Sequence, residues 1–511
     1  MSLRKKVLMN AGSNWAGMFI NAAVVLVLVR IILRNLGVDS FGVWALLSSG
    51  LRYPMIFESA FSLSTNRFVA FYRNDSEQLN RFVSASFVIL LSLAVITIAA
   101  AVLLSFFISG IFTAITDELA GEAQITCILV GVTLALKMFE ATFSGSLRGY
   151  QFDTHVNSVM IVSNLFRAAL TIGILIFWKS IIAVQLAFGI AALISLILMY
   201  IVSRKSIPGF RINIRDVRKE TIRELFRYTG HATGRSGSMI FMYSTLALLV
   251  GRVGSAQDVA VYDIATRIPN FIRGLLAGAQ NVFLPVVTSL YAGGHIEKMK
   301  LVLRKGTHIS CVLTCVMVIL LFVYAREIFV FWLKDAFVPE MIPVMRVLII
   351  SEIARGFFGI WLPSLVGMGH LRSLTIAAIT TAVGAIVVEL ILLRVVFVSV
   401  PMAPAIALVI ALWAYMGLWL PFYGLYKSVI NPFEYFRGSL LGPLAAALVS
   451  IGVLWLLYSF VPRNSVHWSI MFLVSGLIVL ICFTFISLRA EAAELLDVVR
   501  KRFTGRGGHI V

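Results

Sequence analysis

Two tripeptides place a charge and a helix breaker inside long apolar segments. Arg52-Tyr53-Pro54 and Arg267-Ile268-Pro269 each lie within a mostly hydrophobic stretch, and no other proline has arginine two positions before it. A guanidinium near the centre of a bilayer costs at least about 2.5–3.5 kcal/mol, so it usually pairs with an acid or serves a function. Proline frees a helix carbonyl, which membranes tolerate beside a cavity or another helix. Because guanidinium stays charged when desolvated and binds phosphate bidentately, these tripeptides predict an anion-binding cavity.

Further arginines would extend this cavity along its depth. At about 1.5 Å rise per residue, Arg52 lies about 16 Å below the outer end of its span, Arg267 about 12 Å and Arg273 about 21 Å. Arg235 begins a span near the cytoplasmic face, and Arg30 lies toward the outer end of the first span. The candidate substrate-binding residues are therefore Arg30, Arg52, Arg235, Arg267 and Arg273, with Pro54 and Pro269 as helix breaks.

Acidic residues in the same spans have two uses. Asp263 lies four residues before Arg267, and Glu352 lies three before Arg355, spacings at which side chains on one helix face form ion pairs. An acid inside a membrane can also bind a proton or a sodium ion and so couple transport to a gradient. The candidate coupling or ion-pair acids are Glu58, Asp263 and Glu352, whereas Arg355, Lys137 and Arg167 are interpreted as structural.

The composition indicates a membrane protein. Of 511 residues, 60% are hydrophobic and 13% are charged, against about 25% charged residues in soluble domains. The formal net charge is +19, but the basic residues gather in short loops between apolar spans, which reflects membrane orientation and not nucleic-acid binding. No nucleotide, hydrolase or zinc-protease motif is present and the histidines are dispersed, so neither a metal nor a cofactor is expected. Core packing is expected for the four cysteines, Cys127, Cys311, Cys315 and Cys482.

About fourteen stretches of roughly twenty apolar residues predict an all-α integral membrane fold. The predicted spans are 11–34, 41–64, 84–108, 123–147, 155–177, 179–202, 231–251, 259–290, 307–332, 340–364, 374–397, 403–426, 437–460 and 467–488. The longest loop separates two groups of six spans. The predicted domains are an N-terminal six-helix bundle (1–202), a cytoplasmic basic linker (203–230), a C-terminal six-helix bundle (231–428) and an additional helix pair with a basic tail (429–511).

Alternate loops differ in charge. One set contains clusters of arginine and lysine, including eight basic residues in the central loop, whereas the opposite set is sparse or acidic, as at Asp117 and Glu118. Basic loops stay in the cytoplasm, so both termini are expected there, which requires an even number of spans. The basic segments RDVRKETIRELFRYTG in the central loop and AELLDVVRKRF in the tail are expected on the inner membrane surface.

The two groups of spans resemble each other at a nearly constant offset of about 215–224 residues. The paired tripeptides lie 215 residues apart, and glycine-rich helix ends recur at Ser144–Gly149 and Gly367–Arg372. Since each group has six spans, the repeats share one topology, as in transporter halves related by an axis along the membrane normal. The sequence thus predicts two bundles around a cavity that can open to either side.

The stretch from Val29 to Asp75, which includes NLGVDSFGVWALLSSGLRYP, resembles the opening of bacterial polysaccharide flippases. These are the Wzx-type O-antigen or oligosaccharide exporters, which belong with lipid II flippases and MATE multidrug transporters in one superfamily. The resemblance extends through the Gly–Arg helix ends and implies a MATE-like pair of six-helix bundles that work by alternating access. It also implies a cationic cavity for a diphosphate-linked sugar. The polyprenyl tail would stay in lipid, in a groove formed by the helices after about residue 437.

The expected function is translocation of a polyprenyl-diphosphate-linked oligosaccharide across the bacterial inner membrane, for lipopolysaccharide O-antigen, capsule or exopolysaccharide synthesis. Membrane lipid and the polysaccharide polymerase machinery are the expected partners. Moving about two negative charges out of a negative interior releases roughly 4–5 kcal/mol at 100 mV, so the membrane potential favours export, with or without a proton or sodium gradient. Two alternatives stay open: a lipid II flippase for peptidoglycan and a cation-coupled multidrug antiporter. A membrane glycosyltransferase or polymerase is disfavoured because the outer loops are too short for a catalytic domain.

Overall fold

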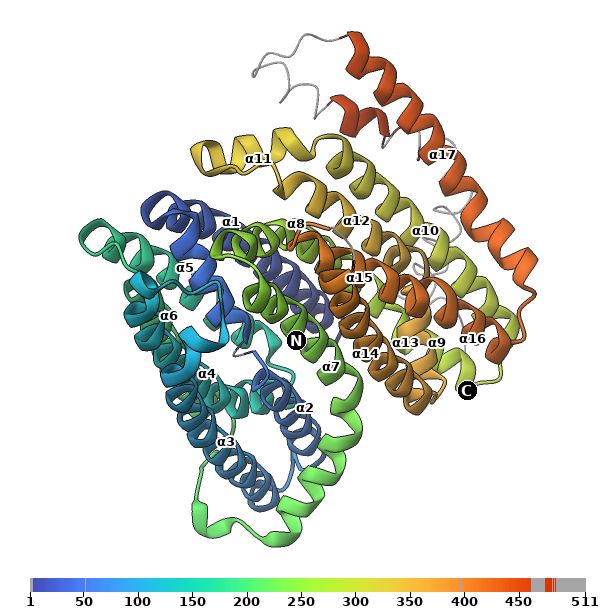
Figure 1. Ribbon diagram of the computed structural model, residues 1–511. Coiled ribbons are helices and arrows are strands. Elements are labelled where there is room, and N and C mark those ends of the chain that lie inside the picture. The colour runs from blue at the N-terminus through green and yellow to red at the C-terminus, as the bar shows by residue number, and fades with distance from the viewer. Residues whose placement is uncertain are drawn as a thin grey trace. The chain divides into compact units, whose positions relative to one another are not determined.

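The computed structural model describes residues 3–50, 52–395, 398–460, 474–479, 481 and 483, and these form helices and turns with no strand among them (Figure 1). The all-α membrane fold predicted from the sequence is confirmed. Most of the predicted last span at 467–488, the basic tail and Cys482 lie outside the described residues. The other three cysteines are buried free thiols.

The helices follow one another with short connections. In chain order they are α1 (Leu3–Gly50), α2 (Met55–Phe71), α3 (Ser76–Ile111), α4 (Asp117–Gly149), α5 (Asp153–Phe177), α6 (Ile181–Ser206), η1 (Ile214–Asp216), α7 (Lys219–Val253), α8 (Ala256–Asn281), α9 (Phe283–Ala292), α10 (Ile296–Val323), α11 (Ala325–Leu333), η2 (Lys334–Ala336), α12 (Met341–Phe358), α13 (Trp361–Gly367), α14 (Leu371–Val395), α15 (Met402–Leu412), the π-helical η3 (Trp413–Trp419), α16 (Leu420–Ser428) and α17 (Pro432–Phe460).

Within the described ranges, eleven helical segments are long and apolar enough to cross a membrane. The first of these segments, Trp15–Gly50, contains both the predicted first span and the start of the predicted second span. The two are continuous in α1 except at Gly37, whose backbone is not helical and has φ 81°. Glycine adopts this left-handed conformation without steric cost. The predicted spans 41–64 and 340–364 are each divided in the structure, between α1 and α2 and between α12 and α13.

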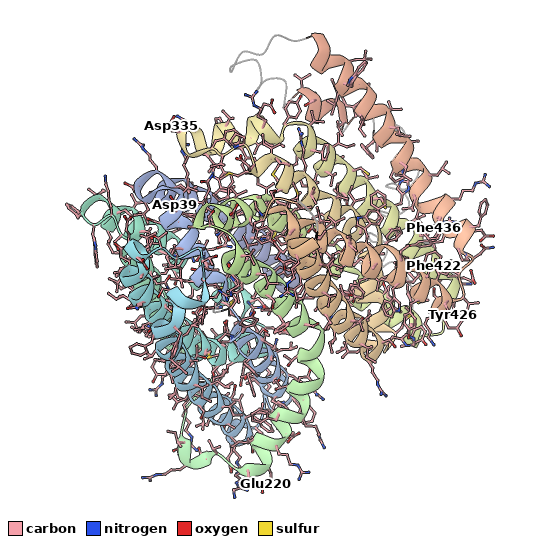
Figure 2. All side chains as sticks on the ribbon, viewed as in Figure 1. Asp39, Glu220, Asp335, Phe422, Tyr426 and Phe436 are labelled. Atoms are coloured by element: carbon pink, nitrogen blue, oxygen red, sulfur yellow. The ribbon has the colours of Figure 1, made fainter. Side chains whose placement is uncertain are left out.

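Contacts group the chain into two compact units. The first unit comprises Met1–Arg267, Trp332–Met341 and Ala378–Ala407, and the second comprises Ile268–Phe331, Ile342–Ala377 and Leu408–Val511. In the first unit, α2, α3, α4 and α7 pack together around buried apolar side chains (Figure 1). Figure 2 shows Asp39 and Asp335 at one end of this unit and Glu220 at the other. The predicted domain boundaries remain a prediction.

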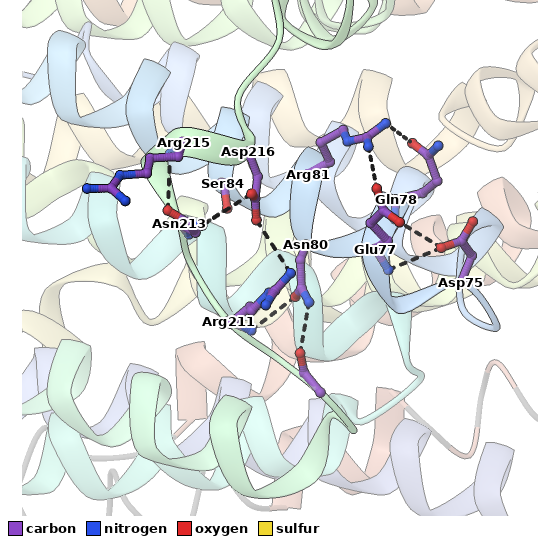
Figure 3. Close-up of polar contacts among 11 residues, drawn as sticks. Asp75, Glu77, Gln78, Asn80, Arg81, Ser84, Arg211, Asn213, Arg215 and Asp216 are labelled. Atoms are coloured by element: carbon purple, nitrogen blue, oxygen red, sulfur yellow. Dashed lines mark hydrogen bonds and ion pairs between the residues drawn. The ribbon is translucent and has the colours of Figure 1, made fainter.

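The segment between α6 and α7, within the predicted linker, is hydrogen-bonded to α3 (Figure 3). The buried Asn80 donates from Nδ2 to the carbonyl of Gly209 at 2.8 Å and accepts the Arg211 backbone N–H at 3.0 Å. Buried Ser84 accepts the Asn213 N–H at 3.0 Å. Because buried polar groups are expensive to leave unpaired, these bonds fix the course of the segment on the first unit.

Glycines bring two pairs of helices into close contact at equivalent positions. A Cβ added to Gly145 in α4 would lie 2.6 Å from the carbonyl oxygen of Ser62 in α2. A Cβ added to Gly367 in α13 would lie 3.4 Å from the carbonyl oxygen of Leu284 in α9 and 2.5 Å from the hydroxyl of Thr288. Gly367 follows Gly145 by 222 positions, and Leu284 follows Ser62 by the same number. This recurrence of one contact in three dimensions supports the internal repeat.

Substitution of Gly145 by alanine is expected to destabilise the protein by about 1–3 kcal/mol, because a backbone carbonyl occupies the space of the new methyl group. The check is the thermal unfolding midpoint of the purified full chain in detergent. Gly173→Ala in α5 is the matched control, since nothing lies within 4 Å of a Cβ there. In a helix interior that change should be neutral or stabilising by up to about 1 kcal/mol. Equal shifts for the two variants would contradict the close α2–α4 contact.

Candidate functional site

The helix break at Arg52-Tyr53-Pro54 is the first feature of the site. α1 ends at Gly50 and α2 begins at Met55, and a turn joins them through the Met55 N–H, which donates to the carbonyl of Arg52 at 2.9 Å. Proline lacks an N–H and so cannot continue the helix hydrogen bonds. The break is held against α7, where the Tyr53 and Thr245 hydroxyls lie 3.0 Å apart and the Tyr53 ring packs on Phe241.

Arg52 is an exposed residue at the break between α1 and α2. Protein atoms around its guanidinium nevertheless remove part of the hydration of that group. Among the described residues, this guanidinium makes no hydrogen bond and no ion pair closer than 4 Å. It interacts electrostatically with Asp263 and Arg267 in α8. An exposed cation without a bonded partner is free to bind an anion.

Arg267 has the partner that Arg52 lacks. Its Nε donates to the Asp263 carboxylate at 3.0 Å, one helical turn earlier, as the sequence spacing indicated. Pro269 lies inside α8, which continues to Asn281, so the helix break expected at Pro269 is not present there. Proline removes a single backbone donor, and the flanking hydrogen bonds carry the helix past it. The actual interruption of this span is at Val282, between α8 and α9.

The second unit contains a separate ionic cluster. Arg273 in α8 donates from Nη2 and Nε to one oxygen of Glu352 in α12, at 2.8 and 3.1 Å. Arg355 donates from Nε to the other oxygen at 3.0 Å. The Glu352 side chain has no exposed surface. One buried carboxylate thus joins two guanidiniums, and Arg273 is bonded to an acid where the sequence suggested a substrate-binding cation.

The remaining predicted residues are Glu58, Arg30 and Arg235. Glu58, in the first turn of α2, interacts electrostatically with Lys137 and Glu140 of α4. Glu140 in turn accepts a hydrogen bond from the Ser195 hydroxyl at 2.9 Å. Arg30 in α1 and Arg235 in α7 are partly buried. Their use in binding remains a prediction.

Arg167 in α5, for which the sequence suggested a structural role, lies close enough to Arg267 of α8 for their charges to interact. It interacts electrostatically with Arg267, and its guanidinium carbon lies 4.7 Å from the centre of the Phe188 ring. Its Nε is buried and has no hydrogen-bond partner among the described residues. One signal in the sequence pointed to this difference: Lys137 and Arg355 each have an acid three positions away, and Arg167 has none at three or four.

In the first unit, the Asp263 carboxylate therefore interacts with Arg52 and Arg267, and Arg267 interacts in turn with Arg167. We call Arg52, Arg167, Arg267 and Asp263 the guanidinium cluster. Arg52 comes from the α1–α2 break, Arg167 from α5, and the Arg267–Asp263 pair from α8. Such an arrangement can bind phosphate oxygens from several directions in a site of low dielectric, where charge interactions are strong.

Two known protein families match most of the sequence. The family of polysaccharide biosynthesis proteins matches residues 6–291, and the MatE family matches residues 236–391. The uncharacterized membrane protein EpsK of Bacillus subtilis (strain 168) is 23% identical over 526 aligned positions, which cover 99% of each chain.

Solved structures of membrane transporters share the fold. The lipid II flippase MurJ in an inward closed conformation superposes with a TM-score of 0.72 at 16% identity, over 94% of this chain and 98% of that one. An inward-facing MATE multidrug transporter of the MOP superfamily gives 0.64 at 16% identity, over 81% and 98%. The MATE multidrug transporter DinF-BH gives 0.62 at 19% identity, over 83% and 96%. The chain is thus a multi-pass membrane protein with the MATE and MurJ fold.

Proposed function

This chain belongs to the polysaccharide biosynthesis protein family, and from that membership we propose that it is a flippase for a lipid-linked oligosaccharide. The cargo in this proposal is a polyprenyl-diphosphate-linked glycan. The protein moves it from the cytoplasmic to the outer leaflet of the bacterial inner membrane, by alternating access. Both termini are placed in the cytoplasm, as the basic loops indicate.

The observation that carries the proposal is the state of Arg52. A cation that is exposed, surrounded by protein and without a hydrogen bond among the described residues is ready for an anionic ligand. Organic cations, the cargo of the antiporter alternative, would be repelled by the guanidinium cluster. A diphosphate is attracted by it, and guanidinium groups bind phosphate oxygens in pairs. The membrane potential favours outward movement of such a ligand, and the proposal allows coupling to protons or sodium through Glu58 in addition.

The test is deletion of the gene followed by leaflet-resolved analysis of lipid-linked sugars. The proposal expects a diphosphate-linked oligosaccharide to accumulate on the cytoplasmic leaflet and surface polysaccharide to be lost. The wild-type gene should remove the accumulation and restore the surface polysaccharide. The identity of the accumulated glycan separates O-antigen, capsule and exopolysaccharide. Accumulation of lipid II alone would make the peptidoglycan alternative correct. An unchanged lipid pool, together with cation-driven dye efflux by the purified protein in liposomes, would replace the flippase by a drug antiporter.

A further inference from the structure

The first turns of α7 have two sides of different chemistry. On one side, Leu225 has no exposed surface and belongs to the buried apolar cluster formed with α2, α3 and α4. The Thr229 hydroxyl, also buried, lies 2.7 Å from the hydroxyl of Ser64 in α2. The residues exposed on the other side are Lys219, Glu220, Arg223, Phe226 and Arg227, whose spacing places them together on one side of a helix. Packing on the first unit therefore fixes which side of α7 faces outward.

This outward side is basic. Lys219, Arg223 and Arg227 follow one another at intervals of four residues, a spacing at which like charges on a helix repel each other. Glu220 is the only exposed acid between positions 219 and 227. Arg67 of α2 is also exposed and adds a cation, since its guanidinium carbon lies 4.2 Å from the centre of the Tyr228 ring. An anion from outside the chain would relieve this repulsion. We call Lys219, Arg223, Phe226 and Arg227 the basic face of α7.

Two span ends meet at the basic face, which places it at a membrane boundary. The Phe226 ring contacts the Phe61 ring of α2 edge-on, with 5.4 Å between their centres. Phe61 lies in the last turn of the predicted span 41–64. From Thr233 onward, α7 itself is apolar enough to cross a membrane. Lysine and arginine clusters in such a place, directly beside a span, are attracted to anionic lipids.

Phe226 distinguishes this surface from a basic loop that only faces water. Its side chain is 51% exposed, although it is large and apolar. Helices that lie in the membrane interface combine exposed aromatic residues with lysine and arginine, because the ring enters the boundary between headgroups and acyl chains. The sequence predicted that this segment lies on the membrane surface. The structure adds the residues that face the lipid.

We propose that the basic face of α7, together with Arg67, is a binding site for the headgroups of anionic phospholipids. The ammonium and guanidinium groups bind the lipid phosphates, and Phe226 packs against the first part of the acyl chains. The site is separate from the guanidinium cluster and does not depend on the cargo. The proposed function could therefore fail while this inference holds, and the reverse is equally possible.

The experiment titrates the purified full chain in a neutral detergent with phosphatidylglycerol and, separately, with phosphatidylcholine, and measures bound lipid by native mass spectrometry. The wild-type protein should bind phosphatidylglycerol at least about tenfold more tightly, since each basic residue near an anionic lipid contributes about fivefold. The variant Lys219→Gln, Arg223→Gln, Arg227→Gln should lose about tenfold or more of its phosphatidylglycerol affinity. Its phosphatidylcholine affinity should change by less than about threefold. The charge-conserving variant Lys219→Arg, Arg223→Lys, Arg227→Lys should bind both lipids as the wild type does.

A control variant tests whether the site is local. It replaces three exposed basic residues of other elements by glutamine, namely Lys179, Arg326 and Lys334. This control should keep the full phosphatidylglycerol affinity. An equal loss in the control and in the α7 variant would show that net charge, and not a site on α7, attracts the lipid, and would overturn the inference. Full affinity in the α7 glutamine variant would overturn it as well.

Salt dependence of the wild-type protein gives a test that needs no variant to fold. Exposed charges are screened at high ionic strength, so the preference for phosphatidylglycerol should fall below about threefold at about 0.5 M sodium chloride. A preference that does not change with salt, or no preference at low salt, would contradict binding by the basic face.

Discussion

Replacing Arg52 by glutamine is expected to abolish export of the lipid-linked glycan, with a loss of roughly 100-fold or more, while the inserted protein stays at its normal level. The large effect follows from the surroundings of the side chain. The Arg52 guanidinium has no bonded partner to give up when it binds phosphate, and each charged hydrogen bond contributes about 1.5–3 kcal/mol. Two such bonds exceed a factor of about 100.

The measurement is surface polysaccharide in the deletion strain complemented with each variant, together with the amount of protein in the membrane fraction. Arg215→Gln is the matched control: it removes the same charge from an exposed position in the segment after α6, outside the guanidinium cluster (Figure 3). The control should export normally. Normal polysaccharide in the Arg52→Gln strain would refute the role of Arg52 in binding cargo.

Protein stability should not explain that loss. The Arg52 guanidinium makes no hydrogen bond or ion pair in the described part of the chain, so its removal leaves no acid without a bonded partner. Arg267→Gln differs, because it takes the bonded partner from Asp263 and leaves that carboxylate facing Arg52. A defect in Arg267→Gln can therefore arise indirectly, by neutralisation of Arg52. This is why Arg52 is the more informative position for the first experiment.

Local spacing in the sequence predicted the parts of the site that depend on one helix. The Asp263–Arg267 and Glu352–Arg355 pairs follow from separations of four and three residues. The interruption at Pro54 follows from proline chemistry, and the spans follow from hydrophobic length. These features need no knowledge of how helices pack.

Local spacing in the sequence does not predict contacts between different helices. Arg273 forms a hydrogen bond with the carboxylate of Glu352, 79 positions later in the chain. Arg167 interacts electrostatically with Arg267, which lies 100 positions later. Which faces of α5, α8 and α12 meet depends on packing of similar apolar surfaces, and a single sequence does not specify it. For the same reason, Pro54 and Pro269 looked equivalent, although only the first interrupts its helix.

The second large effect is expected at Glu352, where replacement by glutamine should destabilise the protein by about 3–5 kcal/mol. Glu352 has no exposed surface and accepts hydrogen bonds from both Arg273 and Arg355. Glutamine retains the shape but cannot compensate the two positive charges, which then repel each other in a desolvated site. Arg273→Gln should be much milder, because Glu352 keeps its bond to Arg355.

The order of these two variants is the decisive quantity, measured as thermal unfolding midpoints of the purified full chain. Loss of the shared carboxylate should lower the midpoint by several degrees more than loss of either arginine. The combined variant Arg273→Met, Glu352→Leu, Arg355→Met should recover much of the lost stability, since apolar replacement of a whole buried ionic cluster is often neutral. If Arg273→Gln proved more damaging than Glu352→Gln, Arg273 would contribute more than charge balance. Arg273 would then be one of the cargo-binding arginines, as its position in the span predicts.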